Sequence, residues 1–541
     1  MSELKEYVVT LKNYDDLDDF YDDMETPGGN LYIPNRIVDL AQRRPISRST
    51  HYMLTDQEAE QVRNDPRVIS VELLPEDLGI IIRPAWIQTS SFWDKSLTTD
   101  DANHRNWGLL RVVEGTQRPN WGDDGTSNQT ATIEVKNEGR NVDVVVVDGL
   151  INPNHPEMFN SQGVTRVKQF NWYSLNPSLG LGSAGNYFYG QYTGTSAEDD
   201  NNHGVHVAGT VAGLTQGWAR QSDIYNITPY STDPNATNIL NVIDYIRQWH
   251  RTKPINPVTG RRNPTVSNHS YGFYWTGNIS NITAISHRGE PYITGFTSSF
   301  LNSVGIYNTG STFRFGARYT ALEADITDAM NDGIIVIGAA MNDYMKIDVA
   351  NGIDYNNTVY WTSGSTNYSA YYHRGGAPSA GNNVICVGAV GRSKDDSKAP
   401  FSNCGPRVDI YAPGRSIMSS LHSGSGYATD PRNSSFLLGK YSGTSMATPQ
   451  VSGLVACLLE TYPNYNQSQV LDYLIKTSKN NQMYDSGGDY TDFNSLQGSP
   501  NRYLAYFNER PDTGTTWPKK NVNLRPTSGR MYPRVRVTRF K

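Results

Sequence analysis

A continuous run of β-branched residues constrains the fold of this 541-residue chain more than any other feature. Residues 142–147 read VDVVVV, and branched apolar side chains on both sides of a strand suit a parallel sheet that is covered on both faces. Comparable runs lie at 334–340, 383–390 and 407–414, and a helical pattern at 321–333 precedes the first of them. Strands that alternate with helices predict an α/β fold, a doubly wound and mostly parallel sheet with helices on both faces.

Other segments predict how the rest of the chain is organised. Residues 1–80 alternate strand and helix patterns, which indicates a small α+β, ferredoxin-like domain. Residues 81–104 show no clear period and are interpreted as a linker to a main domain at 105–510. Within that domain, the Gly-, Ser-, Asn- and aromatic-rich stretch near 273–318 is expected to be an inserted loop region.

Composition argues against a membrane or disulfide-rich protein. No apolar run approaches the ~18 residues of a membrane span, and the start, MSELKEYVVT, lacks the apolar core of a secretory signal. We therefore expect a chain that stays in the cytoplasm or within a particle rather than one that is secreted by the ordinary route. The three cysteines are widely spaced, which favours reduced thiols over disulfides or a metal cluster.

The C-terminal segment 511–541 is a basic tail. From Pro518 onward it holds eight basic residues and no acidic one, although the whole chain has a net charge of -6. Such a tail could bind nucleic acid or another acidic surface. We favour an arm that packs on the acidic body of the same protein, so nucleic acid is not expected as a partner apart from this tail.

Four polar residues stand where a parallel sheet gathers its functional groups. Asp148 ends one predicted strand and Asn342 follows another, while His203 and Ser445 each open a helical pattern. Sites in such sheets form beyond the carboxyl ends of the strands, so these side chains can converge. Each residue alone has an ordinary explanation, such as a helix cap for the serine or a packed core position for the histidine.

Together, the four residue types suit acyl transfer. A serine hydroxyl needs a base to take its proton, histidine is such a base at neutral pH, and a carboxylate orients the imidazole. An Asn side-chain amide and the amides of a helix start can stabilise the oxyanion of a tetrahedral intermediate. The pattern therefore predicts a nucleophilic serine hydrolase.

Several motifs resemble the subtilisin-like serine proteases. They read VDVVVVDGLINPNHPEM, NNHGVHVAGTVAG, VSNHSYG, GIIVIGAAMND, APFSNCGPRVDIYAPG and SGTSMATPQVSG, and they occur in the order of that family. The resemblance implies an Asp148–His203–Ser445 triad with Asn342 in the oxyanion hole, no required cofactor, and protein or peptide substrates. It also implies that Ser270, Tyr271 and Gly272 bind substrate as an added strand.

The same resemblance extends to the N-terminal domain. Residues 1–80, notably TDQEAEQVRNDPRVISVELLPED, are similar to the inhibitory propeptide of the family. The chain is then expected to be a self-processed zymogen with its own N-terminal domain as inhibitor. His206, the second histidine of its motif, is expected to be buried support.

Three positions depart from the family pattern. Gly149 stands where a Ser or Thr hydroxyl commonly supports the catalytic carboxylate, and Val205 replaces a usual Thr. Met341 replaces a usual Gly before the oxyanion Asn, at a position that could need a positive φ that Met resists. We expect reduced activity from the first change and a possible displacement of Asn342 from the last.

Calcium is common in the family, but its ligands are not evident in this sequence. Glu157, nine residues after Asp148, stands where a calcium-binding carboxylate often lies. The loop after the His203 helix is short, however, and the about six to eight oxygen ligands of calcium cannot be assembled from the sequence. The metal ligands are therefore left open.

The main hypothesis is a serine endopeptidase made as a zymogen. The alternative is a weakly active or inactive protein of the same fold that serves as a structural or interaction protein, for example in a virus particle. An esterase is less favoured, because Gly-Thr-Ser-Met-Ala differs from the Gly-x-Ser-x-Gly elbow of those enzymes.

Overall fold

The fold is taken from a computed structural model of the chain. It describes residues 4–33, 40–44, 46–75, 77–84, 107–114, 137–160, 162–168, 170, 172–181, 202–229, 239–391 and 396–506. The predicted basic tail at 511–541 lies outside the described residues.

The N-terminal domain is a two-layer α+β unit, as predicted. Its elements are β1 (Lys5–Leu11), α1 (Leu17–Glu25), β2 (Leu40–Gln42), β3 (Ser49–Leu54), α2 (Asp56–Arg63) and β4 (Val68–Leu73). The strands form an antiparallel sheet in the order β2-β3-β1-β4, the β-α-β-β-α-β arrangement of ferredoxin-like domains. Phe20 and Met24 of α1 and Val62 of α2 bury their side chains in a core of this domain's own.

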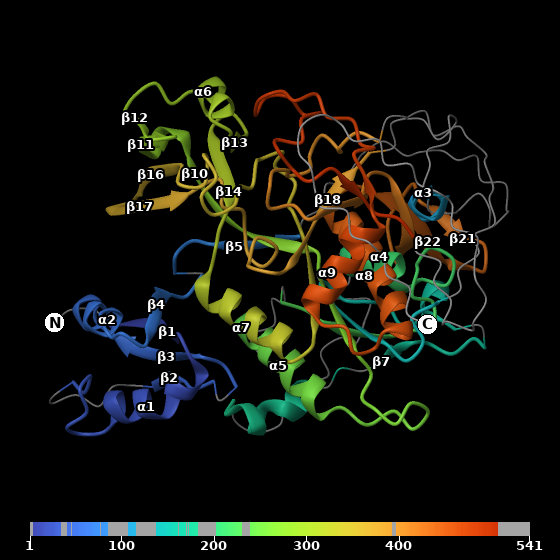
Figure 1. Cartoon of the computed structure of the whole chain (residues 1–541), viewed down its shortest axis with the longest axis horizontal. Coiled ribbons are helices and arrows are strands. Elements are labelled where there is room, and N and C mark those ends of the chain that lie inside the picture. Colours follow the sequence, from blue (N-terminus) through green and yellow to red (C-terminus); the bar gives the residue numbers. More distant parts are fainter. Residues whose placement is uncertain are drawn as a thin grey trace, which may run out of the picture. The chain divides into compact units, whose positions relative to one another are not determined.

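A nine-stranded sheet forms the main domain (Figure 1). In spatial order its strands are β23 (Lys479–Asn480), β24 (Arg502–Tyr503), β19 (Ile410–Pro413), β18 (Ile385–Val390), β15 (Ile335–Ala339), β9 (Thr265–His269), β6 (Asp143–Val147), β8 (Asp223–Ile227) and β7 (Val167–Lys168). All neighbouring pairs are parallel except β23 with β24. The predicted doubly wound sheet is confirmed.

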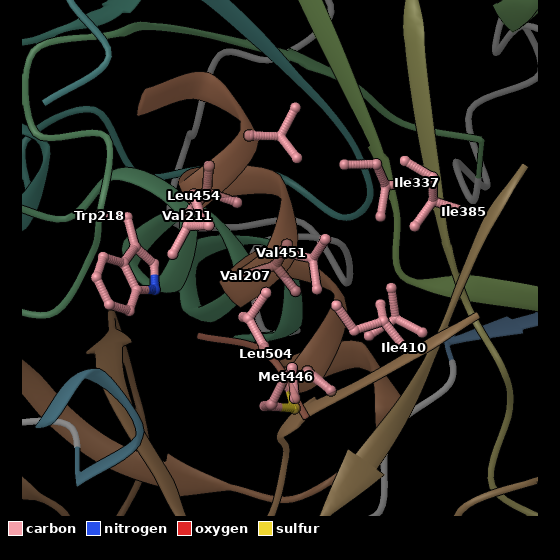
Figure 2. Packing of buried hydrophobic residues seen from close by; sticks show 14 of the residues in the cluster. Val207, Val211, Trp218, Ile337, Ile385, Ile410, Met446, Val451, Leu454 and Leu504 are labelled. Atoms are coloured by element: carbon pink, nitrogen blue, oxygen red, sulfur yellow. The ribbon is translucent and has the colours of Figure 1, made fainter. Parts of the chain in front are cut away.

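Helices cover both faces of this sheet, because its strands alternate apolar side chains between two cores. Val144 and Val146 of β6 join a cluster with α3 (Trp107–Glu114), α4 (His203–Ala212), α8 (Thr444–Thr461) and α9 (Gln467–Thr477). Val145 and Val147 join a second cluster with α5 (Ile239–Thr252) and α7 (Thr320–Asn331). Figure 2 shows α8 in the first cluster, where Val451 and Leu454 lie near Val207 and Val211 of α4.

The stretch near 273–318, expected to be loops, contains regular structure. It holds β10 (Tyr271–Asn278), β11 (Ile282–His287), β12 (Glu290–Tyr292), α6 (Ser298–Ser303), β13 (Tyr307–Asn308) and β14 (Thr312–Gly316). A distant segment supplies β16 (Thr358–Ser363) and β17 (Thr366–Tyr371), which extend the sheet β12-β11-β16-β17. The aromatic residues that suggested an irregular insert, such as Phe313 and Phe315, build a separate apolar core.

The predicted linker begins with a strand. Residues Ile81–Pro84 form β5, which pairs antiparallel with β10 at the edge of the sheet β13-β14-β10-β5. The run of isoleucines before Pro84 suits an extended strand, but it was too short to show a period in the sequence. The remainder of the predicted linker, residues 85–104, lies outside the described residues.

Candidate active site

The predicted site residues lie around the carboxyl ends of three central strands. Asp148 follows β6, Ser270 follows β9, and Asn342 stands shortly after β15. The chain continues from β6 to strands on both of its sides, β8 and β9, so the strand order reverses here. Such a switch point is where open parallel sheets form their sites.

Asp148 and His203 form a buried pair. His203 Nδ1 lies 2.6 Å from Asp148 Oδ1, and both side chains are fully shielded from solvent. The start of α4 approaches the end of β6 so closely that a Cβ on Gly204 would lie 2.1 Å from the carbonyl oxygen of Gly149. Glycine at position 204 therefore allows the imidazole to reach the carboxylate.

Ser445 is the second residue of α8, and its two oxygens both contact Ser270. The Ser445 hydroxyl donates to the Ser270 carbonyl at 2.8 Å, and the Ser270 hydroxyl donates to the Ser445 carbonyl at 3.0 Å. Pro449 lies four residues after Ser445 and has no amide hydrogen, so it cannot make the usual helical bond to that carbonyl. Pro449 is the sixth residue of α8 and thus lies beyond its first turn.

Asn342 is held in place by two hydrogen bonds from Thr444. Its Oδ1 accepts hydrogen bonds from the Thr444 amide at 2.9 Å and from the Thr444 hydroxyl at 3.0 Å. The Nδ2 atom is buried and has no hydrogen-bond partner among the described residues. Because Oδ1 accepts both bonds from Thr444, the polar atom of this side chain that is left without a partner in the described part of the chain is the donor Nδ2.

Tyr271 and Gly272 begin β10, the strand whose edge β5 occupies. In this register Tyr271 is opposite Pro84 and Gly272 is opposite Arg83. The segment that was predicted to bind substrate as an added strand is therefore paired with residues from the chain's own N-terminal part.

A comparison with known proteins agrees with this geometry. The family model Peptidase_S8, described as "Subtilase family", matches residues 139–499 of the chain, which include all of these site residues. The chain belongs to the subtilase family. This subtilase is therefore a serine peptidase of subtilisin-like fold.

Two relatives show the extent of the similarity. An extracellular serine proteinase of Thermus sp. (strain Rt41A) is 26% identical over 434 residues, which cover 80% of this subtilase and 71% of the relative. A subtilisin of Bacillus pumilus is 27% identical over 342 residues, which cover 63% of this subtilase and 84% of the relative. Among solved structures, fervidolysin from Fervidobacterium pennivorans has 17% identity and a TM-score of 0.49, and covers 92% of this chain and 60% of that one.

The three departures from the family pattern have different local effects. At Gly149, the backbone amide donates to Asp148 Oδ1 at 2.8 Å, but Oδ2 is buried and has no partner among the described residues. Val205 is buried in the apolar core next to α8. Met341 adopts the positive φ, +78°, that was anticipated for this position, and Asn342 still keeps both bonds to Thr444.

Protein groups occupy both carboxylate oxygens of Glu157, the residue considered as a calcium ligand from the sequence. Glu157 is fully buried, and its Oε2 accepts bonds from the amides of Thr215 at 2.9 Å and Gln216 at 3.0 Å. Its Oε1 accepts bonds from the Thr215 hydroxyl and the Arg432 guanidinium. No cluster of His, Cys, Asp or Glu in the described part of the chain could hold a metal. The residues around Glu157 therefore do not fit calcium.

Sequence reasoning missed Thr444 and Arg432. Thr444 also accepts a hydrogen bond from the Met341 amide at 3.1 Å, so it ties both residues of the Met-Asn pair to α8. Its position directly before Ser445 was the available signal. Arg432 lies 275 residues from Glu157, and nothing in the sequence links the two.

His206 has the supporting role that was expected. Its Nε2 lies 2.9 Å from the Ile417 carbonyl, and its ring stacks on Tyr441. Burial lowers the pKa of His206 to about 3, so the ring is neutral.

No helix in the described ranges has both the length and the apolar character that are needed to cross a membrane. The expected lack of export stays a prediction.

Proposed function

We propose that this subtilase is a serine endopeptidase that forms an acyl-enzyme on Ser445 and is made as a self-processed zymogen. The observation that carries the proposal is the buried 2.6 Å contact between His203 Nδ1 and Asp148. A carboxylate at Nδ1 fixes the imidazole tautomer in which Nε2 can accept a proton.

The chemistry begins with a rotation of the Ser445 hydroxyl from the Ser270 carbonyl to His203 Nε2. His203 takes the hydroxyl proton while Oγ bonds to the carbonyl carbon of the substrate. The resulting oxyanion accepts hydrogen bonds from Asn342 Nδ2 and from the Ser445 amide, which has no acceptor within the helix at this first-turn position. His203 then protonates the leaving amine as the C–N bond breaks, and a water molecule hydrolyses the ester by the reverse sequence.

The pairing of β5 with β10 supports the zymogen. A peptide substrate would add to the same edge, with Ser270, Tyr271 and Gly272 as its backbone partners. β5 ends with Pro84 opposite Tyr271, the residue after Ser270, and Ser270 contacts Ser445. We therefore propose that the self-processing cut falls after Pro84, within residues 85–106.

Two measurements test the proposal. A fluorophosphonate probe should label the wild-type protein at Ser445 and should not label Ser445→Ala. N-terminal sequencing should find a new N-terminus within 85–106 in wild type and an intact chain in Ser445→Ala. Absence of both labelling and cutting in wild type would refute the proposed endopeptidase activity.

A third measurement tests the oxyanion donor. The variant Asn342→Leu should lower kcat by about 10²–10³ and leave KM nearly unchanged, a range that was established on a subtilisin. A change confined to KM would assign Asn342 to ground-state binding instead.

The second candidate is a structural or interaction protein on the same fold. It is favoured by the unpartnered Oδ2 of Asp148 and by the Ser445 hydroxyl that donates to Ser270. Turnover of a denatured protein substrate by wild type, with none by Ser445→Ala, would exclude it.

A further inference from the structure

One arginine of the N-terminal domain is completely buried in the main domain. Arg44 lies between β2 and β3, and its side chain has no exposed surface. Its Nε donates to Asp244 Oδ2 at 2.9 Å, and its Nη2 donates to Asp325 Oδ2 at 2.6 Å. Nη2 also donates to the Leu240 carbonyl at 2.9 Å.

The two carboxylates belong to helices that pack against each other. Asp244 is on α5 and Asp325 is on α7, with side chains that are 3% and 0% exposed. Burial raises the pKa of Asp244 above its usual range, and the Arg44 guanidinium opposes that rise. In the described ranges, Arg44 is the cation that forms an ion pair with either carboxylate.

The same interface holds a second buried contact, in which the Ser47 hydroxyl donates to Asp325 Oδ1. Among the described residues, the other ion pair between the two domains is more exposed than those of Arg44. Arg48 pairs with Asp328 at 3.3 Å, and both side chains keep about a seventh of their surface exposed, 15% and 14%. Removing one member of a buried ion pair leaves the other charge buried and uncompensated, and the cost is largest where no solvent reaches the charge. Among the ion pairs of this interface, those of Arg44 are therefore the most costly to break.

We propose that Asp244 and Asp325 form an arginine socket, and that Arg44 in this socket holds the N-terminal domain on the main domain after the chain between them is cut. The inference rests on the proposed zymogen, and it names the contact that sets the lifetime of the inhibited state. The partner chemistry is a guanidinium on a folded domain; a lysine ammonium cannot match its planar fork.

The first experiment uses the uncut full chain, Ser445→Ala, and hydrogen–deuterium exchange of α5, α7 and β1. Adding Arg44→Ala should speed exchange at this interface by about 100-fold or more, and Arg44→Lys should restore only part of the protection. The matched control is Arg43→Ala. Arg43 pairs with Glu25 and lies over Tyr21, within the N-terminal domain. Equal exchange in the Arg44→Ala and Arg43→Ala proteins would overturn the socket.

A companion variant separates the socket from general loss of folding. In an Asp325→Asn background, where one buried charge is already removed, Arg44→Ala should increase exchange much less than in the parent protein. If Arg44→Ala increases the exchange rate by the same factor in both backgrounds, the two effects are additive and the proposal is overturned.

The second experiment uses the active chain. After self-cutting, Arg44→Ala should shorten the lag before full peptidase activity, whereas Arg43→Ala should not. An uncut wild-type chain would contradict the proposed function, but the exchange experiment would still decide the socket. An unchanged lag together with a changed exchange would overturn the claim that Arg44 sets the lifetime of the inhibited state.

Discussion

The hydroxyl of Ser270 donates to the carbonyl of Ser445, the one carbonyl of the first turn of α8 that Pro449 leaves without its helical amide. In return, the Ser445 hydroxyl donates to the Ser270 carbonyl. This reciprocal pair fixes the start of α8, with Ser445 as its second residue, to the end of β9.

We expect Ser270→Ala to leave the buried Ser445 carbonyl without a donor. An unsatisfied buried acceptor costs about 1–3 kcal/mol, so the free energy of unfolding should fall by that amount. Urea unfolding of the Ser445→Ala protein, with and without Ser270→Ala, measures the difference without self-digestion. The double variant Ser270→Ala, Pro449→Ala restores an amide and should recover part of the loss; no recovery would show that the carbonyl is satisfied in another way.

A hydroxyl at position 149 should strengthen the Asp148–His203 pair. Asp148 Oδ2 is buried without a partner in the described residues, and a hydrogen bond to a charged group contributes about 1.5–3 kcal/mol. Gly149→Ser is therefore expected to raise kcat/KM several-fold in steady-state peptide hydrolysis. Gly149→Ala is the matched control, since it adds the Cβ without the hydroxyl. If the two variants have the same kcat/KM, the missing partner of Asp148 Oδ2 does not limit peptide hydrolysis.

The variant Met341→Gly compares the cost of backbone strain at position 341 with the benefit of side-chain packing there. The positive φ of Met341 costs about 1–3 kcal/mol, but its side chain fills space against Gly272 and Gly376, and its loss costs about 2–5 kcal/mol. The loss of packing should outweigh the relief of strain, so Met341→Gly is expected to be less stable than wild type by about 1–2 kcal/mol. Met341→Ala keeps the strain and loses the packing, so it should be less stable still by thermal unfolding. A glycine variant more stable than wild type would reverse the ranking of the two effects.

Chelators should leave the stability of the protein unchanged, because Arg432 supplies the positive charge at Glu157. The melting temperature of the Ser445→Ala protein should be the same with EDTA and with added calcium. Arg432→Ala breaks a pair whose carboxylate is fully buried, and it should lower the free energy of unfolding by about 3–5 kcal/mol. A fall in the melting temperature with EDTA would show that a cation, and not Arg432, holds this region.

Acid should destabilise the protein through neutral buried histidines. Burial lowers the pKa of His206, His269 and His373 to about 3 each, from 6.5. Below pH 6.5 the unfolded chain takes up protons that the folded chain does not, so stability is present above that pH and is lost as pH falls toward 3. Each histidine contributes a slope of about 1.4 kcal/mol per pH unit in that window.

Urea unfolding of the Ser445→Ala protein between pH 7 and 4.5 measures this slope. His373→Gln, which removes one titrating ring far from Ser445 in sequence, should make the slope of stability against pH shallower. Stability that stays constant down to pH 4.5 would contradict the assignment.

The sequence was informative where a local pattern has a single structural solution. The valine-rich run at 142–147 predicted a doubly covered parallel strand, which is β6. The positions of Asp148, His203, Asn342 and Ser445 at strand ends and helix starts were predictable for the same reason. Their catalytic roles stay predictions.

Features that depend on contacts between distant residues were not predictable. The partner strands of the insert come from 358–371, and the Arg432–Glu157 pair spans 275 residues. Aromatic and glycine-rich composition suggested loops at 273–318, because local patterns do not show which distant strand completes a sheet. The same reason explains why Arg44 drew no attention, since its burial depends on two other helices.

The pairing of β5 with β10 also determines what a cut in the chain can change. A sheet edge offers one row of backbone partners, so in the proposed zymogen β5 and a substrate peptide would exclude one another there. While the chain is intact, β5 would compete as a tethered group at an effective concentration of about millimolar. The proposed cut would turn that fixed local concentration into one that falls with dilution, so the onset of activity would depend on the protein concentration.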